Sequence, residues 1–559
     1  MSKRSKRLPF LVALVVAPLA IGSPLAQAVE LTTGDPDVKL RWDTTIKYSS
    51  AFRIEARSNA LADSPPATVN ADDGDRNFGR GLVSNRLDVF SEADLLYRNV
   101  GARVSVAGWY DTVYNASNDN DSPFTANQRS VPYNQFTSDT RRVHGRDLEL
   151  LDTFVFGSAY LGDVKSSFRA GRHAILWGES LFFGSNGIAG AQAPVDVIKL
   201  ISVPNSLFKE TTRPVGQVSG QLQLSKGVSV AGYYQYEWEK SRLPGVGSYF
   251  SSSDIVDIGG ERLIVGAPLV PGGGPAAFFR GTDQPARNSG QGGLALRLHT
   301  AIADYGVYAV RWHSKTPFVY VRPAVFLPPG GGPPIVLDPA NFNPTAGQLG
   351  QYYLVYPENI RTFGGSATTT VGEANIAGEL SIRRNTPLAS KPLTVTAAQP
   401  ADNNGNPAYA VGNSAHAQAS VVWTLGPTFI AKSALLLAEA AWNRVTSTTR
   451  NAQNRDPNAT DDAVALRMVF EPVYRQVFPG VDVTVPVGMS YSPRGRSSVV
   501  GAFAVDKGGD INFGLTATYL ETWRATLALT HFYGRVAPTG YVQNLGDRDF
   551  IAFTVRTTF

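Results

Sequence analysis

Hydrophobic and polar residues alternate along many stretches of this chain, and residues 38–54 show the pattern most clearly. One set of alternate positions carries Val, Leu, Trp, Ile, Tyr and Phe, whereas the other carries mostly Lys, Arg, Asp, Ser and Thr. A period of two is typical of a β-strand with one apolar and one polar face. These seventeen residues exceed an ordinary globular strand and can cross a bilayer at a tilt. Similar patterns recur at 217–224, 228–239, 481–491, 511–519 and 523–529.

The carboxy-terminal residues 548–559 form another strand of this kind. Alternate positions carry Ile551, Phe553, Val555 and the terminal Phe559. An apolar face with no further chain to cover it is unfavourable in water, but it suits a closed barrel surrounded by lipid. A terminal Phe on such a strand resembles the assembly signal of bacterial outer-membrane barrels. We therefore expect Phe559, with Val555 and Phe553, to be read by the barrel assembly machinery.

Short and long connections alternate between the predicted strands. Turns are expected near Gly162, Gly227, Gly372 and Gly480, and loops such as 116–145, 241–290 and 317–361 lie between them. Short periplasmic turns and long extracellular loops are typical of bacterial barrels. The sequence therefore predicts an all-β protein, a closed antiparallel transmembrane barrel of about 18 strands with both ends periplasmic. The hairpin around Gly372 is weakly marked, so counts of 14 and 16 stay open.

The amino-terminal residues 1–28 have the three-part plan of a secretory signal. Four basic residues precede an apolar run at 8–21, and the small residues Ala26 and Ala28 follow. A membrane anchor is the alternative, but the run is short for a helical span and contains two prolines. We expect cleavage before Val29, which leaves 29–559 as a single barrel domain in the outer membrane of a Gram-negative bacterium.

Composition excludes several classes of function. Loss of the four basic residues of the signal lowers the formal net charge from +5 to +1, so the mature chain has no basic excess for nucleic acid. The chain has no Cys, which excludes disulfides and thiolate metal sites. Hydrophobic residues make up 43% and charged residues 17%, which is low in charge for a soluble surface. We expect no cofactor and no metal, and outer-membrane lipids as the surroundings.

Residues 179–210 combine apolar and charged side chains in a predicted long loop. Such an apolar stretch would be costly on the cell surface, so we expect it to fold into the barrel with its charges paired to lumen residues. It then acts either as a constriction of the channel or as a purely structural brace. The candidate substrate-binding or constriction residues are Arg169, His173, Trp177, Glu179, Asp196, Lys199 and Glu210.

Two features of the pattern leave alternatives open. Arg172 has the parity of the lipid face if Arg169, His173 and Trp177 face the lumen, so it must snorkel or lie at a bulge. The loops 266–276 and 323–340 are rich in Pro and Gly yet apolar. They either pack over the mouth of the barrel, where a hydrophobic ligand could touch them, or are ordered surface loops.

An enzymatic function is not expected. The six His residues are scattered, and neither a nucleophile elbow nor a paired-His metal spacing is present. The acid pairs Asp72–Asp73 and Asp461–Asp462 lie in predicted loops, where we expect them to be solvated or to bind surface cations.

Several segments resemble one proteobacterial outer-membrane family, domain of unknown function number 1302. They read RAGRHAILWGESLFFG from Arg169, APVDVIKLISVPNSLFKE, GQGGLALRLH, YPENI, GELSIRRNTP, VFPGVDV and GDRDF. The RxGRxxxxWGES segment is the most specific, whereas the loop at 492–497 is shorter than the usual form. The resemblance implies an outer-membrane barrel and supports movement of lipidic or other hydrophobic compounds. It also implies two partners, a periplasmic lipid-carrier-like protein and an inner-membrane transporter of the resistance-nodulation-division kind.

The sequence thus predicts an outer-membrane channel or transporter for hydrophobic or amphiphilic, lipid-like compounds. A diffusion porin for small polar solutes is the first alternative, because the polar strand faces carry both acids and bases. A surface scaffold or adhesin, anchored by the barrel, is the second. Substrate, direction of transport and oligomeric state do not follow from the sequence.

Overall fold

A computed structural model describes residues 29–559, except 33, 64, 204–207, 209–210, 327, 329–333 and 504. The expected signal at 1–28 lies outside the described residues, so its cleavage stays a prediction. Among the residues that are described, no helix is both long enough and apolar enough to cross a membrane.

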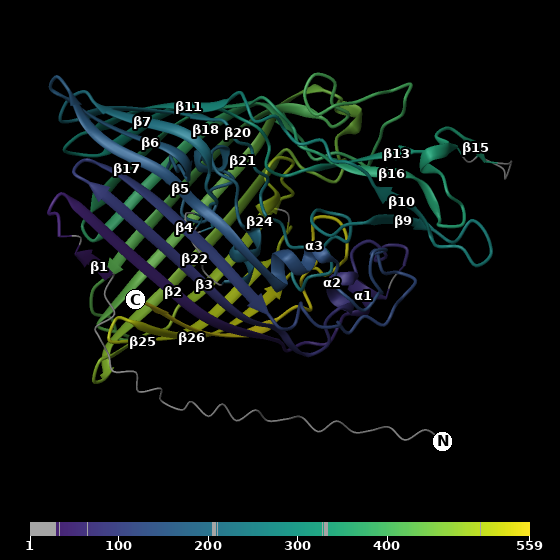
Figure 1. Ribbon diagram of the computed structural model, residues 1–559, viewed down its shortest axis with the longest axis horizontal. Helices are drawn as coiled ribbons and strands as arrows, with labels where there is room; N and C mark the ends of the chain where they lie inside the picture. Colours follow the sequence, from purple (N-terminus) through teal and green to yellow (C-terminus); the bar gives the residue numbers. More distant parts are fainter. Residues whose placement is uncertain are drawn as a thin grey trace.

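One antiparallel sheet of 18 strands closes on itself and forms a barrel (Figure 1). This count confirms the sequence prediction, including the weakly marked hairpin at Gly372. The strands of the ring are β2 (Val38–Arg53), β3 (Gly81–Tyr97), β4 (Val100–Asp111), β5 (Arg146–Leu161), β6 (Val164–His173), β7 (Val215–Gln223), β8 (Val228–Gln235), β11 (Gln291–His299), β12 (Asp304–Trp312), β17 (Ile360–Val371), β18 (Ala374–Pro387), β20 (Val411–Leu425), β21 (Ser433–Arg450), β22 (Asp462–Phe478), β23 (Val481–Thr484) with β24 (Val487–Gly495), β25 (Gly509–Tyr519), β26 (Trp523–Tyr533) and β27 (Phe550–Thr558).

The ring closes where β27 pairs with β2. Thr558 lies opposite Thr45, and Phe550 lies opposite Arg53. The backbone of Phe559 adds two hydrogen bonds to Thr44, at 2.7 and 2.9 Å. β23 and β24 both pair with β22 and β25, so they count as one interrupted strand. A short extra strand, β1 (Val29–Thr32), pairs with β2 outside the ring.

The two faces of the strands have the predicted polarity. On β2 the side chains of Trp42, Ile46 and Phe52 are exposed outside the barrel, and Trp42 is 53% exposed. Asp43 and Lys47, at the other parity, face the lumen, where Lys47 lies 3.4 Å from Asp88 of β3. Lipid around the barrel explains why large apolar side chains remain on the outside of a sheet whose inside is charged.

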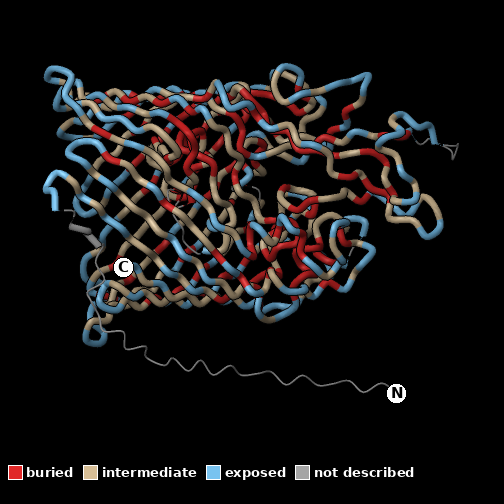
Figure 2. Tube along the Cα trace, viewed as in Figure 1, coloured by how far each residue is buried: buried red, intermediate tan, exposed pale blue. Residues whose placement is uncertain are grey.

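The connections differ at the two ends of the barrel. The C-terminus, strand β1 and the short turns lie at one end, on the left of Figure 1, and the long loops gather at the other. The helices in the described parts of the loops are short turns, and many loop residues are buried (Figure 2). These turns are α1 (Asn59–Ala62), α2 (Asp73–Arg76), α3 (Ser138–Thr140), η1 (Arg141–Gly145), η2 (Ile188–Ala191), α4 (Val197–Ser202), η4 (Pro339–Asn341), η5 (Ala452–Asn454) and η6 (Gly501–Phe503).

A second sheet projects from the long-loop end (Figure 1). It consists of five strands that belong to stretches expected to be loops. The Pro- and Gly-rich residues 266–276 form the hairpin between its first two strands, and 323–340 lie between the third and the fourth. Its strands are β9 (Arg262–Gly266), β10 (Ala276–Arg280), β13 (Phe318–Pro323), β16 (Gln348–Val355) and β19 (Leu393–Thr394), and β14 (Val325–Phe326) pairs with β15 (Ile335–Val336) nearby.

Candidate functional site

The connection between β6 and β7, residues 174–214, runs inside the barrel, and we call it the inward segment. It carries η2 and α4 and is described except at 204–207, 209 and 210. Figure 2 shows buried chain within the ring as well as in the loops. The structure confirms the predicted inward fold, and the side chains that hold the segment define the candidate site.

The first contact of the inward segment is with the wall formed by β8, β11 and β12. Trp177 is 6% exposed, and its ring lies 5.1 Å from the ring of Tyr233 on β8 and 6.0 Å from that of Tyr308 on β12. Ile188 of η2 joins the same cluster together with Ala295 of β11. Large apolar and aromatic side chains therefore pack here on the inside of the barrel wall.

Two lumen carboxylates on other strands hold the backbone of the inward segment. Glu379 of β18 accepts the N–H groups of Glu179, at 3.0 Å, and Ile188. Glu439 of β21 accepts those of Phe182, at 2.5 Å, and Phe183, at 2.8 Å, with a longer bond from Leu181 at 3.3 Å. Hydrogen bonds to a charged acceptor each contribute about 1.5–3 kcal/mol. These carboxylates compensate backbone donors that the segment leaves without strand partners.

A lumen guanidinium holds the carbonyl groups of the next residues. Arg383 of β18 donates to the backbone oxygens of Ser185, Asn186 and Gly187 at 2.8–2.9 Å. The side-chain oxygen of Asn186 lies 3.0 Å from Nδ1 of His416 on β20 and accepts from Asn443 of β21 at 3.2 Å. The chain between 181 and 187 is thus fixed to β18, β20 and β21.

The aromatic side chains of this stretch pack against the same side of the barrel. Phe182 and Phe183 belong to a cluster with small and branched residues of β21 and β22. The ring of Phe183 lies 5.3 Å from that of Phe503 in η6, and the guanidinium of Arg467 lies 5.4 Å above the ring of Phe182. The inward segment therefore crosses from the β8–β12 wall to the β18–β22 wall.

Arg169 and His173, predicted to face the lumen, lie on β6 before the inward segment. Arg169 is exposed and lies 5.7 Å from the ring of Phe154. His173 is 1% exposed, and its Nε2 lies 2.9 Å from Oγ of Ser219. Arg172 lies at the long-loop end of β6, and its ion pair with Glu237 of 2.6 Å compensates its charge there.

Asp196 belongs to a different part of the inward segment, near the long-loop end. It accepts the backbone N–H of Lys199 at 3.0 Å and forms an ion pair with Arg242 at 3.2 Å. Arg242 also pairs with Glu149 of β5 at 2.5 Å. Lys199 is exposed on α4, and Glu210 lies outside the described residues. The predicted residues thus form two groups, one around Trp177 and Glu179 and one around Asp196.

A polar recess of 380 Å³ lies between Glu179 and the short-turn end. Its ionisable lining side chains are Glu179, Arg297, His299 and Asp304. Within the described part of the chain, Glu179 forms no ion pair with a lumen side chain, although the sequence predicted one. The predicted pairing of Glu179 is therefore wrong. The charged side chains that hold the inward segment, Glu379, Glu439 and Arg383, belong to the barrel wall and bind backbone atoms of the segment.

The wall formed by β2, β3 and β4 carries charged side chains into the lumen. Arg103 of β4 lies 2.7 Å from Asp94 and 3.3 Å from Glu92 of β3, and Lys47 lies 3.4 Å from Asp88. All five side chains remain 19–34% exposed. We call these residues the charged wall, and they lie on strands other than those that anchor the inward segment.

Sequence reasoning missed the anchoring residues Glu379, Glu439 and Arg383. A signal was present for two of them, because Glu379, Ser381 and Arg383 alternate with apolar residues and fall within the family-like segment 378–387. Glu439 lies in a strand that is otherwise rich in Ala and Leu. Because a charged side chain is costly on the lipid side, the sequence indicated that Glu439 faces the lumen.

Known proteins were compared with this chain by fold and by sequence. Acinetobacter baumannii OccAB3 is similar at 8% identity, with 93% of this chain and 99% of that chain covered and a TM-score of 0.43. Pseudomonas aeruginosa OpdK, solved with vanillate, has 9% identity, 93% and 98% coverage and a TM-score of 0.38. Salmonella typhi OmpF, in complex with daunomycin, has 9% identity, 95% and 100% coverage and a TM-score of 0.35.

A search of curated proteins gave no match. A family profile, in contrast, matches residues 9–559, which is nearly the whole chain. This match confirms the resemblance drawn from the RxGRxxxxWGES segment. The chain belongs to the family described as protein of unknown function (DUF1302).

Proposed function

We propose that this protein is an outer-membrane channel in which the inward segment narrows the passage. The support comes from three features: a closed sheet with no free edge, an apolar exterior and a charged lumen. In hydrocarbon every backbone polar group must be satisfied internally, which a closed barrel achieves. The short-turn end then faces the periplasm and the long-loop end faces the medium.

The anchoring of the inward segment is the observation that carries the proposal. Its Trp177 packs against the wall at Tyr233 and Tyr308. Hydrogen bonds with Glu379, Arg383 and Glu439 hold its backbone along one side of the lumen. The charged wall on β2–β4 bounds the lumen elsewhere. A solute that passes the segment therefore meets fixed charges of both signs as well as apolar side chains such as Leu181 and Ile175.

We propose small amphiphilic compounds as the transported class. A polar or ionised group would be solvated by the charged wall, while the apolar part would contact the inward segment. A purely hydrocarbon solute would gain nothing from the charged side chains and could not replace their water. A diffusion porin for polar solutes is the second candidate, and the polar recess beside Arg297 and Asp304 favours it.

Flux measurements in liposomes test the proposal. Purified protein should admit small amphiphilic carboxylates faster than uncharged sugars of similar size. Glu439→Ala, which releases the backbone of Phe182 and Phe183, should raise the flux of both. Equal entry of sugars and amphiphiles through the wild-type protein would favour the porin. Absence of any flux in wild-type protein and in the Glu439→Ala variant would refute a channel.

The partners implied by the family resemblance belong to the same proposal. A periplasmic lipid-carrier-like protein would meet the short-turn end, where the turns at Gly162, Gly227 and Gly372 lie. Site-specific crosslinkers at Asp163 and Lys226, compared with crosslinkers in the long loops, test this placement in cells. Crosslinks that form only from the long-loop positions would contradict it.

A further inference from the structure

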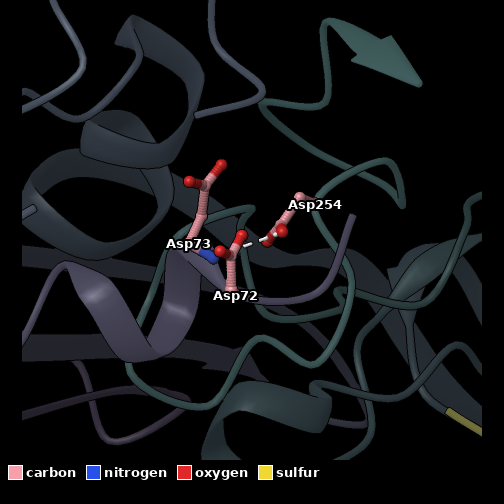
Figure 3. A group of neighbouring side chains, drawn as sticks. All are labelled: Asp72, Asp73 and Asp254. Carbon is pink, nitrogen blue, oxygen red and sulfur yellow. Dashed lines mark hydrogen bonds between the residues drawn. The ribbon is translucent and has the colours of Figure 1, made fainter. Parts of the chain in front are cut away.

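Three carboxylates come together inside the loops of the long-loop end, away from the inward segment. Asp72 and Asp73 lie at the start of α2, and Asp254 comes from the loop between β8 and β9 (Figure 3). One oxygen from each lies within 4.8 Å of the others. All three residues are 0% exposed. Burial of like charges so close together is unfavourable unless a cation or protons compensate them.

Three cations, Arg76, Arg262 and Arg548, lie near the carboxylates, and two of them are shared with acids outside the cluster. Arg76 lies 2.6 Å from Asp72, but the same guanidinium also pairs with Asp63 at 2.6 Å and Asp121 at 3.0 Å. A second, separate group nearby is balanced within itself: Arg53 and Arg548 pair with Asp75, and Arg53 also pairs with Asp547. Arg76 and Arg548 therefore neutralise carboxylates outside the cluster as well as those within it.

Two buried oxygens in the cluster point to a ligand. Oδ1 of Asp72 and Oδ1 of Asp254 accept no hydrogen bond from any described residue. Figure 3 shows the carboxylates of Asp72 and Asp254 directed toward one another. The amide oxygen of Asn127, whose backbone N–H donates to Asp73 at 3.0 Å, is also buried and accepts nothing from the described chain. Oxygen atoms with free lone pairs and without donors are what a hard cation requires.

We propose that Asp72, Asp73 and Asp254 bind a calcium ion that joins the loops over the mouth of the barrel. All candidate ligands are oxygens, which suit Ca²⁺ or Mg²⁺, and irregular loop geometry suits the larger ion, whose coordination is flexible. The three carboxylates come from the β2–β3 and β8–β9 loops, and the β4–β5 loop contacts Asp73 through the backbone N–H of Asn127. One ion would thereby connect two long loops directly and lie beside a third.

The packing around α2 is consistent with this role. A Cβ atom at Gly74 would lie 2.5 Å from the carbonyl oxygen of Ser251 and 2.9 Å from that of Ser248. Only glycine lets the 248–254 stretch approach α2 so closely. Burial, together with the neighbouring carboxylates, also raises the pKa of Asp73 to about 7 and that of Asp254 well above its usual range, so three negative charges are unfavourable here as long as no cation is bound.

Calorimetric titration of CaCl₂ into the full-length protein tests the site. The protein is refolded in detergent without lipopolysaccharide, whose phosphates also bind cations, and is freed of metal with EDTA. We expect one saturable site with a dissociation constant of about 10⁻⁴–10⁻³ M, the range of extracellular calcium modules. Mg²⁺ should bind more weakly. Absence of saturable binding, or tighter binding of Mg²⁺, would overturn the proposal.

Matched variants locate the ion. Asp73→Asn and Asp254→Asn should weaken calcium binding at least tenfold, whereas Asp139→Asn, in the exposed part of the β4–β5 loop, should bind as wild type does. Calcium should also slow hydrogen exchange of residues 65–79 in wild-type protein but not in Asp254→Asn. Unchanged affinity in both cluster variants would overturn the assignment, and the wild-type titration decides the question if a variant does not fold.

Discussion

Glu439 on β21 accepts the backbone N–H of Phe182 at 2.5 Å, although 257 positions separate the two residues in the sequence. The same carboxylate accepts Phe183, and it lies in a lumen where these donors have no strand partner. A side chain of the barrel wall thus replaces the sheet hydrogen bonds that the inward segment lacks.

Loss of this carboxylate should loosen the inward segment. Glu439→Ala leaves three backbone donors without their acceptor, at a cost of about 1–3 kcal/mol for each buried group. We expect larger and noisier single-channel conductance in planar bilayers with normal barrel assembly. Glu439→Gln keeps an oxygen acceptor and should lie between wild type and Ala. The control Glu373→Gln, in a short turn, should not change conductance; an unchanged Glu439→Ala conductance would argue against the constriction.

Trp177 should be important for the fit of the segment against the β8–β12 wall. Trp177→Ala removes a buried indole between Tyr233 and Tyr308, a change that typically costs about 3–5 kcal/mol in a core. Alone and together with Glu179→Ala, it should alter solute uptake without preventing insertion. Trp177→Phe retains an aromatic ring and should have a smaller effect. Wild-type uptake in a correctly inserted double variant would contradict the prediction.

The charged wall should set the ion selectivity. Lys47→Gln with Arg103→Gln removes two lumen cations and takes the Arg103 ion pairs from Glu92 and Asp94, while Asp88 keeps only its pair with Arg86. The channel should then favour cations more strongly, which the reversal potential in a salt gradient measures. Lys226→Gln, in the turn between β7 and β8, removes a cation outside the lumen and should not shift the reversal potential. A shift of equal size in this control would mean that the wall has no special role.

Deletion of Phe559 should impair assembly. Phe559 donates to and accepts from the backbone of Thr44, and these bonds extend the seam between β27 and β2. We expect less of the heat-modifiable, folded species in outer-membrane fractions. Phe559→Tyr retains an aromatic terminus and should assemble nearly as wild type does. Normal levels of the folded deletion variant would rule out a role for the terminal residue.

The buried carboxylates should make the loops of the long-loop end sensitive to pH when calcium is removed. Burial raises the pKa of Asp73 to about 7 and the pKa of Asp72 to about 6, from 3.8. Because these pKa values are higher in the folded state, folding takes up protons. The resulting stabilisation is complete below about pH 4 and is lost as the pH rises through 6 and 7.

The measurement is hydrogen exchange of residues 65–79 in EDTA, corrected for the intrinsic rate at each pH. The cations that face the cluster, Arg76, Arg262 and Arg548, stay charged across this range, so the carboxylates alone titrate. Exchange should increase with pH in wild-type protein and less in Asp73→Asn. Added calcium should suppress the increase, with most effect at the higher pH values. A flat wild-type profile in EDTA would contradict the prediction.

The barrel could be predicted from the sequence because strand alternation is a local property. Apolar and polar side chains alternate at Trp42 and Asp43, and again at Phe553 and Thr554, and this alternation is visible within a few residues. When lipid surrounds the barrel, only one orientation of such a strand is favourable, with the apolar side chains outside. The turn at Gly372, with its positive φ of 59°, was weakly marked but present. The inward direction of the segment after Trp177 also followed, from its apolar composition alone.

The anchors and the loop cluster depend on contacts between distant parts of the chain. No local pattern shows that Glu379 meets residue 188, or that Asp254 meets Asp73 across 181 positions. The acid pair at 72–73 was expected to be solvated or to bind cations at the surface, but the loops around it bury both side chains. Likewise, the strand hairpin at β9 and β10 forms because it pairs with β16, which comes from another loop.

Glu379, Glu439 and Arg383 bind main-chain atoms of the inward segment, which every amino acid offers. Substitutions along 179–187 that keep the backbone path, together with Phe182, Phe183 and Asn186, would therefore preserve the attachment while the other side chains of the stretch change. A scaffold of this kind separates attachment from specificity. Exchange of a few residues in one internal stretch could thus alter the chemistry of the barrel interior without rebuilding the surrounding cylinder.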